Sequence, residues 1–243
     1  MNNLTELNVT GLVISRREVN DDIYVKILLN RGNGVKVFKL KSGRKLTSRL
    51  QLNLDLLNKV KINFIVSGDT CIITRVTCIS MYKNIKLDPM IVMVLADLLD
   101  KVLHDGMEDE DKLLANLLFI LDFWERKPAH KYYISIKFLM QIIRFTGISP
   151  DPSFCPICRK QIEEGSSEIL FNKNGIIHKD CSINDSRSVD GNIYTYMSST
   201  KIWPRKKESV VKPLFPILFE YVGTHFGLNS IANVERYIDY TGI

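Results

Sequence analysis

The chain has 243 residues and a net charge of +6 at pH 7, from 33 Lys and Arg against 27 Asp and Glu. Hydrophobic residues make up 45% of it and the mean hydropathy is −0.01, which is typical of globular proteins with one large or two small domains. No apolar stretch approaches the roughly eighteen residues of a membrane-spanning helix, and the first residues do not resemble a secretory signal. We therefore expect a cytoplasmic protein.

The positive charge is concentrated at the start of the chain. Residues 1–80 carry 13 Lys and Arg against 6 Asp and Glu, an excess of +7, whereas residues 81–150 have 9 against 10 and residues 151–243 have 11 against 11. A basic module joined to a neutral remainder predicts a first domain that faces a polyanion.

The basic region has the pattern of a small β-barrel. Alternating apolar residues and glycine-containing turns predict five strands, at about residues 7–18, 22–30, 34–41, 60–67 and 71–80. A single long connection separates the third strand from the fourth. This arrangement favours an OB-type barrel, with an SH3-like barrel as the alternative.

Basic side chains gather in the third strand and the connection that follows it. OB barrels bind single-stranded nucleic acid in basic grooves, so we predict DNA contacts from this region. The predicted contact residues are Lys36, Lys39, Lys41, Arg44, Lys45 and Arg49, with Lys59 and Lys61 nearby. The aromatic residues of the barrel, Tyr24, Phe38 and Phe64, are more typical of core positions than of base-stacking platforms, which favours binding to the nucleic-acid backbone.

A helical period of about 3.6 begins after residue 80. Asp88 followed by Pro89 is a typical helix start, and helices are predicted at about residues 88–104, 109–125 and 131–146, the last ending at Gly147. Further helices are predicted at 213–226 and 230–240, after a polar stretch, 184–212, of mixed loop and short helix. We expect an α+β protein with a barrel domain at 1–82 and a helical domain at 83–243 that contains a metal-binding segment at about 151–184.

That segment contains two pairs of potential metal ligands. Cys155 and Cys158 form one pair and His178 and Cys181 the other, each with two intervening residues. This spacing is typical of tetrahedral zinc sites, in which each turn directs two ligands at one point. Because four ligands are available, we predict one structural zinc ion per chain rather than a catalytic one. The segment between the pairs is expected to form a hairpin, with bends at Gly165 and at Asn174 and Gly175.

No enzymatic motif accompanies this site. Zinc-dependent nucleobase deaminases pair a C-x-x-C turn with an upstream H-x-E, and neither His104 nor His130 has an acid two residues on. The chain also lacks a glycine-rich phosphate loop. We therefore expect a protein that binds its partners without catalysing a reaction.

The order of these parts resembles the bacterial recombination mediator family RecO. The resemblance rests on the first strand, residues 11–17, the basic loop ending in Ser48-Arg49-Leu50, the glycine and prolines that precede Cys155, and residues 228–237 near the end of the chain. Many members of the family carry four cysteines, whereas here His178 takes the third ligand position.

The resemblance implies a function in DNA repair and recombination after DNA damage. RecO-like proteins bind single- and double-stranded DNA, anneal complementary strands, work with a RecR-like partner, and help load recombinase on DNA coated by single-strand binding protein, whose acidic C-terminal tail they contact. They are bacterial cytoplasmic, nucleoid-associated proteins. The alternative is a zinc-stabilised protein-interaction adaptor without a direct role on DNA.

Overall fold

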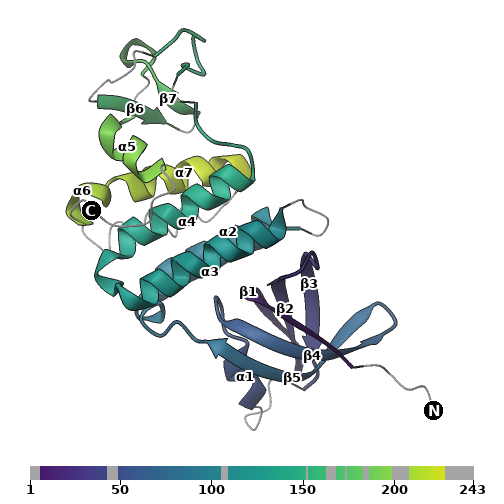
Figure 1. Ribbon diagram of the computed structural model, residues 1–243. Helices are drawn as coiled ribbons and strands as arrows, with labels where there is room; N and C mark the ends of the chain where they lie inside the picture. The colour runs from purple at the N-terminus through teal and green to yellow at the C-terminus, as the bar shows by residue number, and fades with distance from the viewer. Residues whose placement is uncertain are drawn as a thin grey trace. The chain divides into compact units, whose positions relative to one another are not determined.

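The computed structural model describes residues 6–42, 49–104, 109–151, 153–162, 168–172, 174–182, 186–198 and 208–227. The chain divides into two compact units, Met1–Arg126 and Lys127–Ile243 (Figure 1). Within the described ranges, no helix combines the length and the apolar character that a membrane crossing needs. The predicted helix at 230–240 and the bend at Gly165 lie outside these ranges.

The first unit contains a closed barrel of five strands, as predicted. The strands are β1 (Leu7–Val19), β2 (Asp22–Leu29), β3 (Val35–Leu40), β4 (Lys59–Ser67) and β5 (Thr70–Ser80). Their order around the barrel is β1-β2-β3-β5-β4, and β4 closes it by pairing with β1. All pairs are antiparallel except β3 with β5, which pair in parallel through Phe38 and Cys71. This topology confirms the OB-type fold.

The barrel interior is filled by apolar side chains from alternating strand positions. Phe38 is fully buried and Phe64 is 5% exposed, and their rings meet edge to face with centroids 5.1 Å apart. Both are therefore core residues, as their sequence context predicted. Since Phe38 is fully enclosed and Phe64 exposes only a small part of its ring, neither offers a free face on which a nucleic-acid base can stack.

A short helix, α1 (Arg49–Asn53), lies in the connection between β3 and β4. Sequence analysis did not predict it, because five residues are too few for a helical period. The buried Asn58 donates hydrogen bonds to the carbonyls of Asn53 at 3.0 Å and Leu52 at 3.5 Å. The last carbonyls of a helix have no partner within the helix, so this side chain stabilises the end of α1.

Two longer helices complete the first unit. After the 3-10 turn η1 (Ile85–Leu87), α2 (Pro89–Val102) packs on β1, and α3 (Glu110–Arg126) packs on β1 and β2. The Asp88 carboxylate accepts from the Ile91 N–H, which is the predicted helix cap. These contacts place both helices in the same compact unit as the barrel. The domains expected from the sequence, 1–82 and 83–243, divide the chain at an earlier residue than these two units do. Which parts fold independently stays a prediction.

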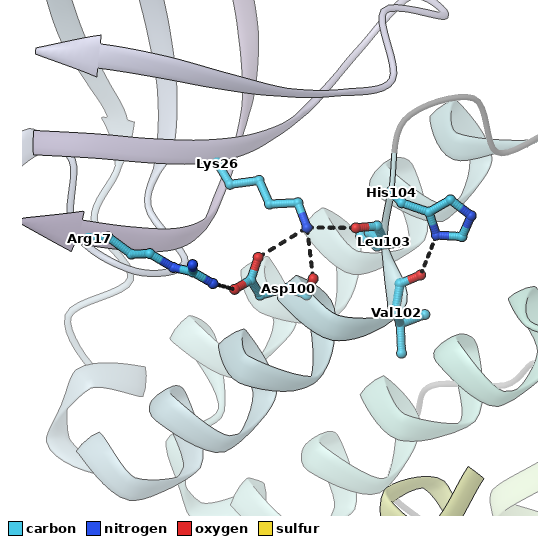
Figure 2. A network of polar contacts seen from close by, with 6 residues as sticks. All are labelled: Arg17, Lys26, Asp100, Val102, Leu103 and His104. Carbon is cyan, nitrogen blue, oxygen red and sulfur yellow. Dashed lines mark hydrogen bonds and ion pairs between the residues drawn. The ribbon is translucent and has the colours of Figure 1, made fainter. Parts of the chain in front are cut away.

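A polar cluster connects the end of α2 to the barrel (Figure 2). Lys26 on β2 donates to the carbonyls of Asp100 and Leu103, each at 2.7 Å, and its Nζ lies 3.0 Å from the Asp100 carboxylate. Arg17 on β1 binds the other oxygen of that carboxylate at 3.1 Å. Lys26 therefore caps the last carbonyls of α2 and also forms an ion pair with the Asp100 carboxylate of the same helix.

Replacing Lys26 by methionine is expected to destabilise the first unit. Burial acts to raise the pKa of Asp100, but Lys26 and Arg17 outweigh it and lower the pKa below its ordinary value. The ion pair therefore stabilises the fold at neutral pH, and this contribution is lost as the pH falls through the lowered pKa. We expect Lys26→Met to reduce the free energy of unfolding by about 1–2 kcal/mol at pH 7, allowing for partial exposure.

Denaturant unfolding of both proteins at neutral and at acidic pH measures this effect. The difference should shrink in acid, where Asp100 becomes protonated in both. Arg17→Gln is the control, because the Arg17 side chain is 74% exposed and should contribute little. Equal stability of Lys26→Met and wild type at pH 7 would contradict the prediction.

The second unit is built around α4 (Lys131–Phe145), which follows the 3-10 turn η2 (Pro128–His130). It packs against α5 (Gly191–Ser198), α6 (Glu208–Val211) and α7 (Leu214–Phe226). Gly147 follows α4 with a φ of 73°, and its N–H donates to the Arg144 carbonyl at 3.2 Å. A glycine in this left-handed conformation is a common way to end a helix, as the sequence predicted.

A small antiparallel sheet carries the cysteine-rich segment. Its strands are β6 (Glu168–Asn172), β7 (Gly175–Ile177) and β8 (Arg187–Asp190), in the order β7-β6-β8. Gly175 begins the return strand with a φ of 115°, in the predicted hairpin bend. The buried Phe171 contacts the rings of Tyr194 on α5 and Tyr221 on α7, at centroid distances of 5.9 and 5.5 Å. These rings attach the sheet to the helices.

Candidate metal centre and nucleic-acid interface

The structure brings together the four predicted metal ligands. Cys155 and Cys158 lie in the turn before the sheet, His178 follows β7, and Cys181 ends the 3-10 turn η3 (Lys179–Cys181). One ligand atom from each residue lies within 4.8 Å of all the others. Cys155 is fully buried and the other three are partly exposed. This Cys3His group could hold a metal ion.

Backbone hydrogen bonds in the first turn favour the thiolate form of Cys155, which is the form that binds a cation. Burial acts to raise the pKa of Cys155, but the backbone N–H groups of Cys158, His178 and Ile157 outweigh it and lower the pKa to about 6. In contrast, hydrogen bonding to Cys158, burial and the charge of the neighbouring sulfurs raise the pKa of Cys181 to about 11. Three sulfurs this close therefore cannot all be thiolates without a positive charge among them. A divalent cation meets that requirement.

The imidazole of His178 directs one ring nitrogen toward the cysteine sulfurs. Its Nε2 donates to the Gln161 carbonyl at 2.8 Å, and its Nδ1 faces the Cys158 sulfur at 3.1 Å. A hydrogen bond from one ring nitrogen to a carbonyl fixes the tautomer, which leaves the lone pair of the other nitrogen free for a metal. The histidine in the third position therefore fits the ligand set. The role of the four residues as metal ligands stays a prediction.

A groove at one end of the barrel gathers basic residues that are distant in sequence. It has a volume of about 440 Å³, and its cations come from the β2–β3 turn, β3 and β4. The cations are Arg31, Lys36 and Lys61, and the other lining residues are Leu7, Asn8, Val9, Thr10, Leu29, Asn30, Asn33, Phe64, Val66 and Cys71. No carboxylate lines it among the residues that the structure describes. The groove therefore has the charge that a polyanion requires.

Lys36 is the predicted DNA-contacting residue that lies in this groove, where it is exposed on β3. Arg31 was missed in the sequence, because it lies in a turn and outside the basic run. Lys41 is exposed just after β3. Arg44 and Lys45 lie outside the described residues, and Arg49 begins α1 with its side chain undescribed.

Lys39 is less available than the others. Its ammonium group lies 2.7 Å from the Asp22 carboxylate and 5.4 Å from the centroid of the Tyr24 ring. The hydrogen bond to Asp22 is the main reason why the pKa of Lys39 is raised. Since a phosphate must compete with this carboxylate, Lys39 is a weaker candidate for a DNA contact than Lys36.

Part of the chain matches a known protein family. Residues 90–199 match the family described as "Recombination protein O C terminal". A protein of Desulfatibacillum aliphaticivorans named DNA repair protein RecO is 20% identical over 186 residues, which are 73% of this chain and 72% of that protein.

The chain was also compared with solved structures. Two crystal structures of asparaginyl-tRNA synthetase from Pyrococcus horikoshii, the second complexed with asparaginyl-adenylate, align with TM-scores of 0.28 and 0.27 and identities of 13% and 12%. The alignments cover 52% and 79% of this chain and 33% and 41% of the synthetase chains. TM-scores this low carry no argument about fold or function.

The family match and the relative agree with the parts described above. The matched range includes all of α2 except its first residue, then α3, α4 and α5, and all four residues of the Cys3His group. The closed five-stranded barrel precedes it, as the resemblance implied. Together these findings show that the chain is similar to the RecO family over residues 90–199 and to one DNA repair protein RecO over most of its length.

Proposed function

We propose that the chain is a recombination mediator that binds single-stranded DNA through its barrel and anneals complementary strands. Similarity to the RecO family supports a role in DNA repair and recombination. The observation that carries the finer proposal is the barrel groove. Among the described residues, three cations and no carboxylate line it, which suits a phosphate backbone.

The proposed contacts are electrostatic and independent of base sequence. Phe38 and Phe64 are buried, so the barrel has no free ring from these residues for stacking. Contacts with phosphates position a strand without reading its bases. This suits an annealing protein, which must hold any strand while leaving its bases free to pair.

The Cys3His group is proposed to hold one structural zinc ion. Zinc bound by cysteine and histidine supplies folding free energy to short segments that bury too little surface by themselves. Cys155, Cys158, His178 and Cys181 would provide all four ligands. With no position left for water, the site would not activate a nucleophile, and the chain would act without covalent chemistry.

The partners follow from the same proposal. A mediator of this kind works with a RecR-like partner and with single-strand binding protein through its acidic tail, and helps load recombinase on the coated strand. The test is annealing of complementary strands, both bare and coated with single-strand binding protein. Annealing of neither substrate would favour the adaptor alternative.

Neutralising the barrel groove is expected to weaken DNA binding in a salt-dependent way. Each phosphate contact contributes about −0.7 to the slope of log affinity against log salt for single strands. The double variant Lys36→Gln and Lys61→Gln should therefore flatten this slope by roughly 1.4 and reduce annealing, which titrations at several salt concentrations would measure.

The control is Lys101→Gln with Lys112→Gln, two exposed lysines on α2 and α3. It removes the same charge from outside the groove and should leave the slope unchanged. An equal loss in both double variants would show that net charge matters and the groove does not. A separate triple variant, Arg44→Ala, Lys45→Ala and Arg49→Ala, tests the predicted loop in the same assay.

A further inference from the structure

The inward-facing side chains of the barrel reach solvent at one of its two ends. Residues two apart on a strand share a face, so the inner rows of β1 and β4 run from the buried core to Leu7 and Val66. Ile62 and Phe64 in these rows are almost fully buried, whereas Leu7 and Val66 are each 44% exposed. The inner surface of the barrel is therefore open to water at this end.

The other end of the barrel is closed by the connection between β3 and β4. Leu50 in α1 packs against the barrel core, and Leu54 just after α1 is fully buried in it. Because this connection follows β3 and precedes β4, it lies where β3 ends and β4 begins. Leu7 begins β1 and Val66 lies near the end of β4, so they belong to the opposite end.

The open end forms an apolar floor in the barrel groove. Leu7 pairs with Phe64 in the register of β1 and β4. Val66 pairs with Cys71 in the register of β4 and β5. The apolar residues that line the groove are Leu7, Val9, Leu29, Phe64, Val66 and Cys71. Since the three cations named above line the same groove, it suits a ligand that is anionic in one part and apolar in another.

Lys36 connects the charge of the groove to its floor. It pairs with Ile27 on β2, whose side chain belongs to the barrel core. Phe38, two residues further along β3, also faces the core. Lys36 therefore begins on the inner face of β3, and its side chain is exposed in the groove. One ligand can contact this ammonium group and the apolar floor together.

Three of the described carboxylates lie near this end, and none of them lines the groove. Glu6 accepts hydrogen bonds from the side chains of Asn63 and Thr74. Asp111 accepts from a backbone N–H of the β2–β3 turn at 2.8 Å. Asp69 is exposed in the turn after β4. Among the described residues, the positive charge of the groove is therefore not neutralised within it.

An apolar floor beside cations favours a strand whose bases are unpaired. Single strands and duplexes both present phosphates, so contacts from cations alone do not favour the single strand. The face of a base can reach an apolar surface only when neighbouring bases and a paired strand do not cover it. Contact between that face and apolar side chains then removes apolar surface from water.

We propose that the open end of the barrel takes in one unpaired base of the bound strand. The base lies against Leu7 and Val66, and Arg31, Lys36 and Lys61 bind the phosphates on either side of it. The proposal rests on the single-strand binding proposed above and adds the feature that distinguishes a single strand from a duplex. Every base has an apolar face, so this contact tolerates any sequence.

The test measures binding of the full-length chain to two oligonucleotides of equal length, oligo-dT and an abasic strand with the same sugar-phosphate backbone. Wild type should prefer oligo-dT. Leu7→Ala with Val66→Ala should weaken binding to oligo-dT by about fivefold or more, since each methyl or methylene group buried against the base contributes a factor of roughly four. It should leave binding to the abasic strand unchanged.

The matched control is Val19→Ala with Val37→Ala. These side chains on β1 and β3 are 50% and 56% exposed and do not line the groove, so binding to both strands should stay unchanged. Leu7→Met with Val66→Ile keeps the floor apolar and should bind oligo-dT as wild type does. Denaturant unfolding of each variant separates a lost contact from a damaged barrel.

Wild-type affinity of Leu7→Ala with Val66→Ala for oligo-dT overturns the proposal and leaves the floor to an acidic peptide. An equal loss on both strands also overturns it, because an abasic strand has no base to insert. Failure of the barrel proposal is distinguishable, since Lys36→Gln with Lys61→Gln would then bind both strands as wild type does. If that charge variant loses affinity and the apolar variant does not, only the base site fails.

Discussion

Cys155→Ser is expected to abolish the proposed zinc binding and, with it, the order of the segment around the site. Cys155 is the fully buried ligand, and backbone hydrogen bonds lower the pKa of its thiol, which favours the thiolate form that binds a metal. Zinc binding contributes roughly 10–16 kcal/mol to the folding of small zinc-binding peptides, so losing a ligand should cost most of the stability of residues 153–190. Metal analysis should show about one zinc per chain in wild type and almost none in the variant after chelator treatment.

Hydrogen exchange locates the damage. Protection should fall in β6, β7 and β8 and persist in the barrel, which shares no ligand with the site. Cys78→Ser is the control, because Cys78 lies in β5, outside the cluster, and should leave the zinc content unchanged. Wild-type protein purified without chelator and found to contain no zinc would contradict the proposed metal site.

Gly11→Ala is expected to destabilise the barrel severely. Gly11 lies opposite Leu29 on β2 and Val60 on β4, and a Cβ added there would clash with the backbone oxygen of Leu28 and lie 2.7 Å from Cγ2 of Ile27. A backbone carbonyl in a closed barrel cannot move alone. We expect the free energy of unfolding to fall by about 3 kcal/mol, at the upper end of typical overpacking costs.

Denaturant or thermal unfolding of the full chain measures this cost. Asn8→Ala on the same strand is the control, because Asn8 is exposed and should change stability by less than about 0.5 kcal/mol. Metal content should be unaffected in both variants. If the free energy of unfolding of Gly11→Ala lies within 1 kcal/mol of the wild-type value, β1 and β2 can move apart without loss of the barrel.

The local structure of the chain was predictable because its signals are local. The five predicted strands agree with the observed ones to within one or two residues at each end, and Asp88 and Gly147 correctly marked the ends of helices. The two ligand pairs were found from spacing alone, since the residues of each turn are close in sequence and must be close in space.

The associations between elements were not predictable in the same way. The apolar stripes of α2 and α3 showed that one face of each helix is buried, but amphipathic periodicity does not identify the surface that covers it. Both pack on the barrel. β8 was missed because Arg187-Ser-Val-Asp190 is short and polar, and its strand conformation depends on pairing with β6. The groove was missed for the same reason, because Arg31 and Lys61 meet only when the barrel closes.

If the Cys3His group holds zinc as proposed, the pairing of β6 with both β7 and β8 makes the order of the second unit depend on the supply of that metal. β7 leads directly to His178, whereas β8 leads directly to α5, and Phe171 between them contacts α5 and α7. A ligand that binds only the folded state shifts the folding equilibrium by mass action. Under metal starvation, the helices around this sheet would therefore be the first to lose order and become open to proteolysis, while the barrel stays intact.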